Sequence, residues 1–235
     1  MRKIYFTTLF IISVLLFQNF KAIDLGFDSK YQVNDQTRKL HAKELLGKKY
    51  KKSSAAKLEG ESLVNTEILI LVQNHLPKKH KSKAEKITKA ILSEANHYNI
   101  DPVFIASIIR TESAFNPRAI GTSGEIGLMQ LMPNTGKYIA HKINMKFYGA
   151  KTLRDPVKNI KLGAAYFNYL REKFDNKANR YIPAYNMGPG KIAKVEQRKD
   201  LPKIYSDKVL KYYEAFYKKI YDAQTLKEAQ LASNN

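Results

Sequence analysis

Two helix-start signals are the feature of this sequence that most restricts its fold. Asp101-Pro102 and Asp155-Pro156 each pair a capping carboxylate with a proline, which favours the first position of a helix. Both pairs are followed by apolar residues spaced three and four apart, and the same spacing begins after residue 82 and returns near the end of the chain. The sequence therefore predicts an all-α domain over residues 82–225, with a very small β-hairpin near residues 120–128 as the β element that the pattern allows.

The N-terminus has the pattern of an export signal. Arg2 and Lys3 precede an apolar run from Ile4 to Phe17, and a basic head with a short apolar core is typical of a secretory signal peptide. A transmembrane helix needs about 20 apolar residues, more than this run contains. We predict a signal peptide over residues 1–22, cleaved at Ala22, with an uncleaved anchor as the alternative. The remaining chain would then be exported to the periplasm or cell envelope, without stable membrane insertion after cleavage.

The chain between the predicted signal peptide and residue 82 has a different character. Residues 23–81 are basic and expected to be partly flexible; no apolar period is sustained there up to Gly60, so we expect that part to be flexible or weakly helical. One helix is expected near residues 62–76, where the run Glu67–Val72 also allows a strand. Residues 226–235 are expected to form a C-terminal tail. A tether, an arm that binds a cell-envelope assembly partner and a cover over a groove are all compatible with the N-terminal region.

The net charge of +20, from 41 Lys and Arg against 21 Asp and Glu, points to a polyanionic partner. Export argues against nucleic acid, and the excess of lysine over arginine favours diffuse attraction to an anionic polymer. The absence of cysteine excludes disulfides, thiolate metal sites and a catalytic thiol. The five histidines form no HExxH pair, so no metal or other cofactor is indicated.

Glu112 is the residue that points most directly to chemistry. On its predicted helix it shares a face with Ile105, Ile108 and Ile109. Burial among apolar side chains disfavours an ionised carboxyl and raises its pKa, as a general acid working near neutral pH requires. An ion pair with Arg110, or a position facing solvent, is the alternative that these residues leave open.

Three sequence blocks follow one another in a fixed order. Glu112-Ser113 ends the predicted helix, Gly127-Leu128-Met129-Gln130 begins 15 positions after Glu112, and Ala184-Tyr185-Asn186 comes later. This arrangement closely resembles the soluble lytic transglycosylase family, whose catalytic domain is related to goose-type lysozyme. The resemblance covers residues 82–220 and implies a mainly α, lysozyme-like catalytic domain.

The resemblance implies cleavage of the β-1,4 bond between N-acetylmuramic acid and N-acetylglucosamine, with peptidoglycan glycan strands as the partner. Glu112 takes the catalytic position: it would protonate the glycosidic oxygen and then deprotonate the muramoyl C6 hydroxyl, leaving a 1,6-anhydro sugar. This chemistry needs one carboxyl, whereas ordinary glycosidases use two, and Glu125 is a candidate for a second. A muramidase-type hydrolase that uses water, and a non-catalytic peptidoglycan-binding or assembly protein on the same fold, are the alternatives.

The same matching assigns substrate-binding roles to Gln130, Met132, Tyr185, Ser113 and Asn186. Gln130 can exchange hydrogen bonds with an acetamido group, and Met132 can pack on a pyranose face or fill a core. Tyr185 would place its hydroxyl near Glu112 or the reacting sugar. Asn186 is also suited to holding a turn.

One position departs from the family pattern. Some members carry a hydroxyl residue nine positions after the catalytic glutamate, and that position is Gly121 here. Thr122 or Ser123 is the candidate to supply the hydroxyl from a neighbouring position, unless the contact is absent.

Overall fold

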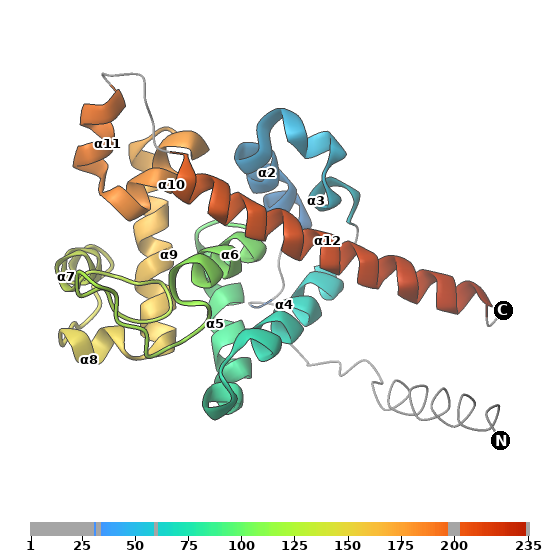
Figure 1. The fold of residues 1–235 in the computed structure, drawn as a ribbon, viewed down its shortest axis with the longest axis horizontal. Coiled ribbons are helices and arrows are strands. Elements are labelled where there is room, and N and C mark those ends of the chain that lie inside the picture. Colours follow the sequence, from blue (N-terminus) through green and yellow to red (C-terminus); the bar gives the residue numbers. More distant parts are fainter. Residues whose placement is uncertain (1–30, 32–33, 59–60, 197–202, 234–235) are drawn as a thin grey trace.

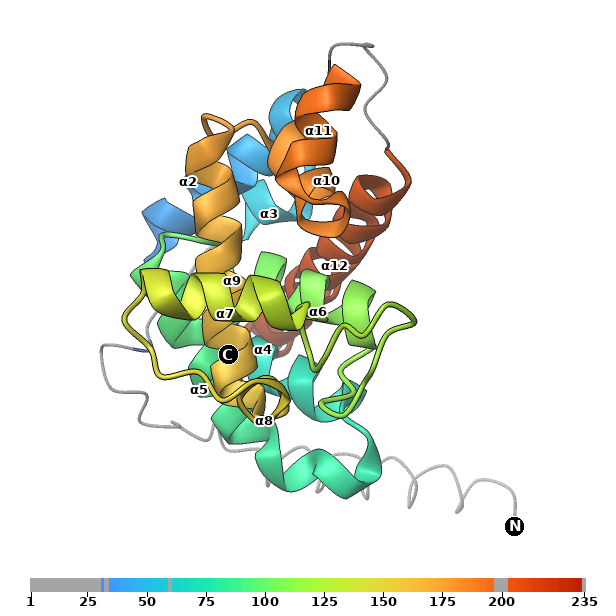
Figure 2. The same ribbon diagram turned by 90° about the vertical axis from the view of Figure 1, so that its left-hand side faces the viewer.

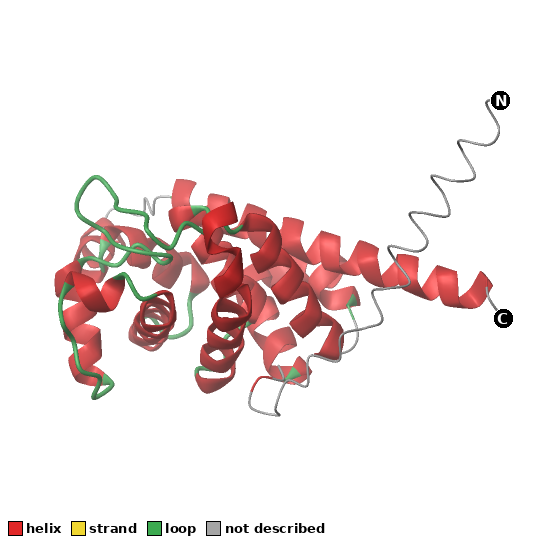
Figure 3. Cartoon of the chain, turned by 90° about the horizontal axis from the view of Figure 1, so that it is seen from below, coloured by secondary structure: helices red, strands yellow, loops and turns green. Residues whose placement is uncertain are grey.

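The computed structural model describes residues 31, 34–58, 61–196 and 203–233; the predicted signal peptide lies outside these ranges. The described residues form helices and loops (Figure 3), which confirms the all-α prediction. The first elements are α2 Asp35–Leu46, the 3-10 helix η2 Gly47–Lys52, α3 Ser54–Lys57, α4 Glu61–His75, the 3-10 helix η3 Lys78–Lys83, α5 Ala84–His97 and α6 Pro102–Ser113. The later elements are α7 Pro133–Lys142, α8 Ala150–Leu153, α9 Pro156–Lys173, α10 Ala178–Met187, α11 Pro189–Glu196 and α12 Ile204–Ser233.

The long helix α12 crosses the molecule, with α2 and α3 on one side of it and α4 and α6 on the other (Figure 1). α6 packs along α12 and against α5, and α9 packs against α5, α7 and α10. Every residue of α6 from Pro102 to Ile109 is buried. The helix whose last turn carries Glu112 is therefore the most enclosed element of the described fold near the site.

Both Asp-Pro signals begin helices, as the sequence predicts. The Asp101 carboxylate accepts a hydrogen bond from the backbone N–H of Val103, and Asp155 accepts from Val157 and Lys158. The prolines occupy the first helical turn, where a missing N–H costs nothing. The helix expected near residues 62–76 is also confirmed, because α4 spans Glu61–His75.

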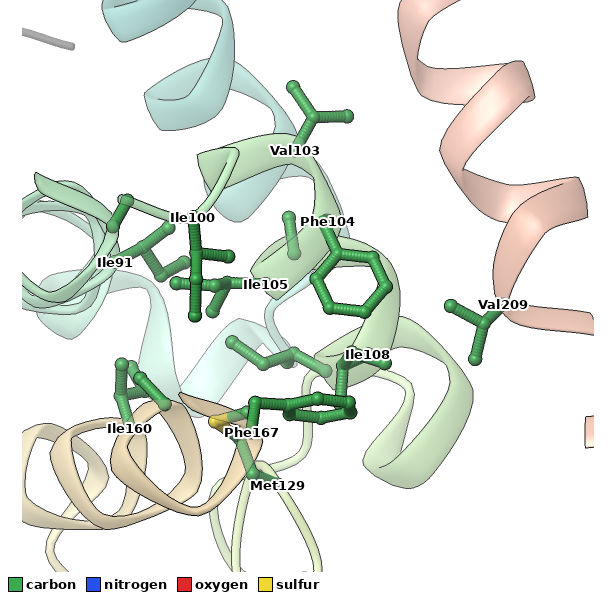
Figure 4. Close-up of a cluster of buried hydrophobic side chains, with 14 of the residues drawn as sticks. Ile91, Ile100, Val103, Phe104, Ile105, Ile108, Met129, Ile160, Phe167 and Val209 are labelled. Carbon is green, nitrogen blue, oxygen red and sulfur yellow. The ribbon is translucent and has the colours of Figure 1, made fainter. Parts of the chain in front are cut away.

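The core joins α5, α6, α9 and the loop that follows α6 (Figure 4). Phe104 of α6 meets Phe167 of α9 edge to face, with ring centroids 5.2 Å apart. Met129 of the loop lies against α9 at Gly163, where an added Cβ would come 2.3 Å from the methionine Sδ. A glycine at this position of α9 lets the loop seat its methionine in the core.

The loop between α6 and α7 contains no strand, although a small hairpin near residues 120–128 was allowed by the sequence. It has two isolated antiparallel bridges, Ile120 with Ile126 and Ile126 with Leu131. The backbone pairs directly at these bridges: Ile126 and Leu131 exchange N–H to carbonyl hydrogen bonds of 3.0 and 3.2 Å. The buried Asn159 of α9 adds to this pairing, since its Oδ1 accepts from the N–H of Met129 at 2.8 Å and its Nδ2 donates to the carbonyl of Ile126 at 2.8 Å.

Helix α2 is a regular helix of 12 residues in a stretch that the sequence analysis expects to be flexible or weakly helical. Its buried residues follow the helical spacing closely: Arg38, His41, Ala42, Leu45 and Leu46. The period is hidden in the sequence because an arginine and a histidine occupy two of the buried positions. A hydropathy pattern counts these residues as polar, whereas the structure buries both.

A polar network in the interior explains how an arginine can be buried on α2. The Nη1 of Arg38 donates to the hydroxyl of Tyr217 on α12 at 3.3 Å and to the carbonyl of Ala55 at 3.0 Å. Tyr217 and Tyr213 both donate to Oδ2 of the buried Asp101 at 2.6 Å. Burial raises the pKa of Asp101, and the two tyrosine hydroxyls oppose that rise by stabilising the carboxylate. Arg38 therefore ties α2 to α12, and Asp101 ties α12 to the start of α6.

Helix α12 also continues through most of the predicted tail at residues 226–235, as far as Ser233. Its buried residues end at Ile220, so burial does not hold the last turns. These turns consist mainly of Leu, Lys, Glu, Gln and Ala, which have high intrinsic helix propensity. The last helix therefore extends into the predicted tail, because the loss of the apolar period does not by itself end a helix.

Candidate active site

The Glu112 side chain lines a cavity of about 360 Å³ at the end of α6. The helix ends there because Ala114 and Phe115 adopt left-handed backbone angles, with φ of 49° and 64°. The residues around the cavity come from the α6–α7 loop, the start of α7, α9 and the end of α10: Glu112, Gly121, Thr122, Glu125, Gln130, Leu131, Met132, Thr135, Tyr166, Tyr185, Asn186, Met187 and Gly188. None of the lining residues lies before α6, so the described part of region 23–81 does not cover the cavity.

Burial raises the pKa of Glu112 to about 7, and the negative charge of Glu125 adds to the rise. The alternative of an ion pair with Arg110 does not hold, because that guanidinium lies over the ring of Tyr212, 5.3 Å from its centroid. A carboxyl with this pKa is protonated in about half of the molecules at neutral pH. It can therefore give up a proton and take one back under the same conditions.

Tyr205 is the site residue that the sequence analysis missed. It lies in the first turn of α12, and its hydroxyl donates a short hydrogen bond to Oε1 of Glu112. Burial, together with the charge of Glu112, raises the pKa of Tyr205 well above its usual value, so the hydroxyl stays protonated and donates. The signal was present in the sequence, because Tyr205 stands four residues before Val209 and eight before Tyr213 on the expected apolar face.

Tyr185 lies in the same cavity with its hydroxyl turned to the protein. The hydroxyl donates to the carbonyl of Met129 at 2.7 Å, and the ring stacks on Phe167 at 4.0 Å between centroids. Burial and the charge of Glu112 raise the pKa of Tyr185 well above its usual value. The side chain thus joins α10 to the loop that carries Gln130, and it presents its ring to the cavity.

Gln130 holds the shape of the loop as well as lining the cavity. Its Nε2 donates to the carbonyls of Gly127 at 2.8 Å and Ala119 at 3.2 Å, while its backbone is left-handed with φ of 45°. Since both amide hydrogens are used within the loop, Oε1 is the atom that Gln130 can offer to a sugar N–H. Gly127 has φ of 85°, and an added Cβ there would meet Asn159 Nδ2 at 2.5 Å.

The remaining predicted substrate contacts divide into two groups. Met132, which is 38% exposed, and the exposed Asn186 both line the cavity. Ser113 is not among the lining residues. Its hydroxyl donates to the carbonyl of Leu128 at 2.7 Å, and the carbonyl of Ile109 is a second, more distant acceptor at 3.2 Å. The structure therefore gives Ser113 a different contact from the predicted one: it fastens the end of α6 to the loop.

The departure at Gly121 has a steric reason. A Cβ added at Gly121 would come 2.2 Å from Oε2 of Glu125, so the Glu125 carboxylate occupies the space that a side chain would need. That carboxylate also accepts from the backbone N–H of Ser123 at 3.0 Å. Thr122 lines the cavity, whereas Ser123 does not. Of the two neighbouring hydroxyl residues, Thr122 is the one in reach of a ligand in the cavity.

Two further findings concern the described ranges as a whole. Across residues 31, 34–58, 61–196 and 203–233, no three His, Asp or Glu side chains gather closely enough to share a metal ion. Within the same ranges, no helix combines the length and apolar character that a membrane crossing requires.

The chain is similar to known lytic transglycosylases. A "putative soluble lytic murein transglycosylase" of Haemophilus influenzae is 38% identical over 96 residues, which cover 41% of this chain and 16% of that protein. A "membrane-bound lytic murein transglycosylase C" of Histophilus somni is 35% identical over 137 residues, covering 54% and 37%. The matched stretches thus take in little more than a third of these relatives at most.

The crystal structure of the 70 kDa soluble lytic transglycosylase of Escherichia coli aligns with a TM-score of 0.48 and 22% identity, covering 71% of this chain and 31% of that one. Residues 89–207, half of the chain, match the family model described as "Transglycosylase SLT domain". This stretch holds Glu112, the whole cavity lining and Tyr205. The chain belongs to the transglycosylase SLT domain family.

Proposed function

We propose that this protein is a lytic transglycosylase that cleaves the β-1,4 bond between N-acetylmuramic acid and N-acetylglucosamine in peptidoglycan. The observation that carries the proposal is Glu112, a carboxyl with a pKa of about 7 in a cavity bordered by the three sequence blocks. The two relatives named above are called murein transglycosylases, which supports the same substrate.

The proposed reaction uses Glu112 twice. Its protonated form gives the proton to the glycosidic oxygen as the bond from C1 to that oxygen breaks. The resulting carboxylate then takes the proton of the muramoyl C6 hydroxyl while O6 bonds to C1, which leaves a 1,6-anhydro end and consumes no water. Because Oε1 accepts the Tyr205 hydrogen bond, Oε2 is the oxygen left to carry the acid proton.

A muramidase-type hydrolase is the second candidate, and Glu125 is the observation that favours it. This carboxylate lines the same cavity as Glu112, and a hydrolase would use it to activate water. Its hydrogen bond from the Ser123 N–H holds it in the loop at the edge of the cavity. The two candidates differ in product, since hydrolysis leaves a reducing end and transglycosylation leaves an anhydro end.

Digestion of purified sacculi, followed by mass spectrometry of the soluble products, tests the proposal. We expect anhydro-muropeptides from the wild type and at least a hundredfold less from Glu112→Gln. Glu125→Gln is the matched carboxyl variant and should keep the anhydro product. Reducing-end products that depend on Glu125 would establish the hydrolase, and the absence of any product would leave a non-catalytic binding protein.

We also propose that the protein works in the periplasm or cell envelope, where its polymer lies. The basic head and apolar run at residues 1–22 support export. The catalytic groups lie within the predicted domain 82–225, and the described residues 35–58 pack on α12 through Arg38. We propose that these residues form one structural unit with the catalytic domain; an assembly partner, if recruited, would bind on its outer face.

A further inference from the structure

We propose that Lys142, Tyr138 and Tyr169, on the face where α7 crosses α9, bind a stem-peptide carboxylate of the strand in the cavity. The inference rests on the proposed function, because it names the part of that substrate which this face would contact. The crossing of the two helices is visible in Figure 2.

A series of aromatic rings connects this face to the cavity. Tyr166 lines the cavity and stacks on Tyr169, with centroids 6.3 Å apart and planes 15° from parallel. Tyr169 then meets Tyr138 edge to face at 5.7 Å. On α7, Thr135 lines the cavity and Tyr138 follows it by three residues, which places both on one side of the helix. A polymer leaving the cavity in this direction would pass along the rings.

The face ends in a cation held by two rings. The Nζ of Lys142 lies 5.2 Å from the centroid of Tyr138 and 5.3 Å from that of Tyr169, within the range of cation–π attraction. Tyr138 is 46% exposed and Lys142 is exposed. Among the salt bridges of the described residues, none involves Lys142. The ammonium group also hydrogen-bonds the Tyr138 hydroxyl, so Lys142 is an exposed cation held at this face by contacts with tyrosines.

The electrostatic surroundings are positive as well. The pKa of Tyr138 is lowered by its hydrogen bond with Tyr169, and further by the hydrogen bond from Lys142 and by the charges of Lys142 and Lys173. Neutral sugar rings can pack on tyrosines without a cation. A cationic end to the aromatic path therefore fits an anionic group attached to the glycan, and in peptidoglycan the stem peptides carry such carboxylates.

The test measures binding, so that it does not depend on turnover. Glu112→Gln protein would be sedimented with intact sacculi and with sacculi stripped of stem peptides by an amidase. Adding Lys142→Ala should weaken binding to intact sacculi about two- to fivefold, as expected for an exposed ion pair, and leave binding to stripped sacculi unchanged. Lys146→Ala is the matched control, since it removes another exposed lysine from the loop that follows α7. It should affect neither substrate.

A second pair of variants tests the role of the rings. Tyr138→Phe keeps the ring but removes the hydroxyl that hydrogen-bonds Tyr169 and Lys142, so it should lose less binding to intact sacculi than Tyr138→Leu. Tyr138→Leu removes the ring as well and should lose about as much as Lys142→Ala. Equal losses on both substrates would overturn the proposal, because the face would then contact sugar. Equal losses with Lys146→Ala, or no loss with Lys142→Ala, would also overturn it. Peptide-dependent binding by a wild type that releases no anhydro product would instead refute the proposed reaction alone.

Discussion

Replacing Tyr205 by phenylalanine removes one oxygen atom and tests how the pKa of Glu112 is set. In the wild type the hydroxyl donates to Oε1 and lowers the pKa, while burial raises it to about 7. A hydrogen bond to a charged group contributes about 1.5–3 kcal/mol. Since 1.36 kcal/mol corresponds to one pKa unit, its loss should raise the pKa of Glu112 by about 1–2 units.

The predicted change appears in the alkaline limb of the pH–rate profile. Because the first step needs the protonated carboxyl, the wild-type rate should fall as pH rises through about 7. In Tyr205→Phe the fall should come about 1–2 pH units higher. The measurement is the initial rate of soluble muropeptide release from sacculi as a function of pH, with anhydro ends quantified by mass spectrometry.

Tyr212→Phe is the matched control, because it removes a hydroxyl from the same helix without altering a hydrogen bond to Glu112. Its profile should coincide with that of the wild type. An alkaline limb that stays in place in Tyr205→Phe, or moves to lower pH, would refute the assignment of Tyr205 as the donor that lowers the pKa of Glu112.

Three further predictions concern stability and substrate attraction. Arg38→Met should lower the free energy of unfolding by about 3–5 kcal/mol, because it leaves buried polar groups without a cation. The measurement is chemical denaturation, with Lys39→Met on the same helix as the control that should change the free energy little. Equal losses in the two variants would contradict the stabilising role of the Arg38 network. Gly163→Ala should cost about 1–3 kcal/mol in the same assay, because the new Cβ would come 2.3 Å from Met129 Sδ; an unchanged midpoint would show that the loop yields. Activity on sacculi should fall as salt rises, given the net charge of +20, and a flat response would reduce that charge to a composition bias.

The parts of the fold that the sequence predicts are those set by local rules. Asp101 and Asp155 cap their helices through hydrogen bonds within three residues, so neighbouring sequence is sufficient. The raised pKa of Glu112 was predicted because its helix face is apolar, and burial is its largest cause. The end of α12 was harder to predict, because helix propensity rather than burial extends this helix to Ser233.

The parts that the sequence does not predict depend on contacts between distant segments. Arg38 is buried because it pairs with the nearby Asp35 and also donates to groups far along the chain, the most distant being Tyr217, 179 residues away. Tyr205 meets Glu112 across 93 residues, and the packing of α12 on α6 brings them together. The Ser113 hydroxyl could serve a ligand or the loop, and the position of Leu128 decides between them.

The hydrogen bonds around Asp101 extend beyond the segment that matches the family model. The matched segment and the segment needed for a stable fold therefore have different limits. The family match runs from residue 89 to 207 and contains Asp101, but not Arg38, Tyr213 or Tyr217. In a fragment cut at those limits, Asp101 would lose both of the tyrosine hydroxyls that donate to its carboxylate. Asp101 is the N-cap of α6, the helix that carries Glu112. The segment that matches the family is thus shorter than the unit that these contacts stabilise. A fragment designed to keep the active site folded should therefore also include α2 and the middle of α12.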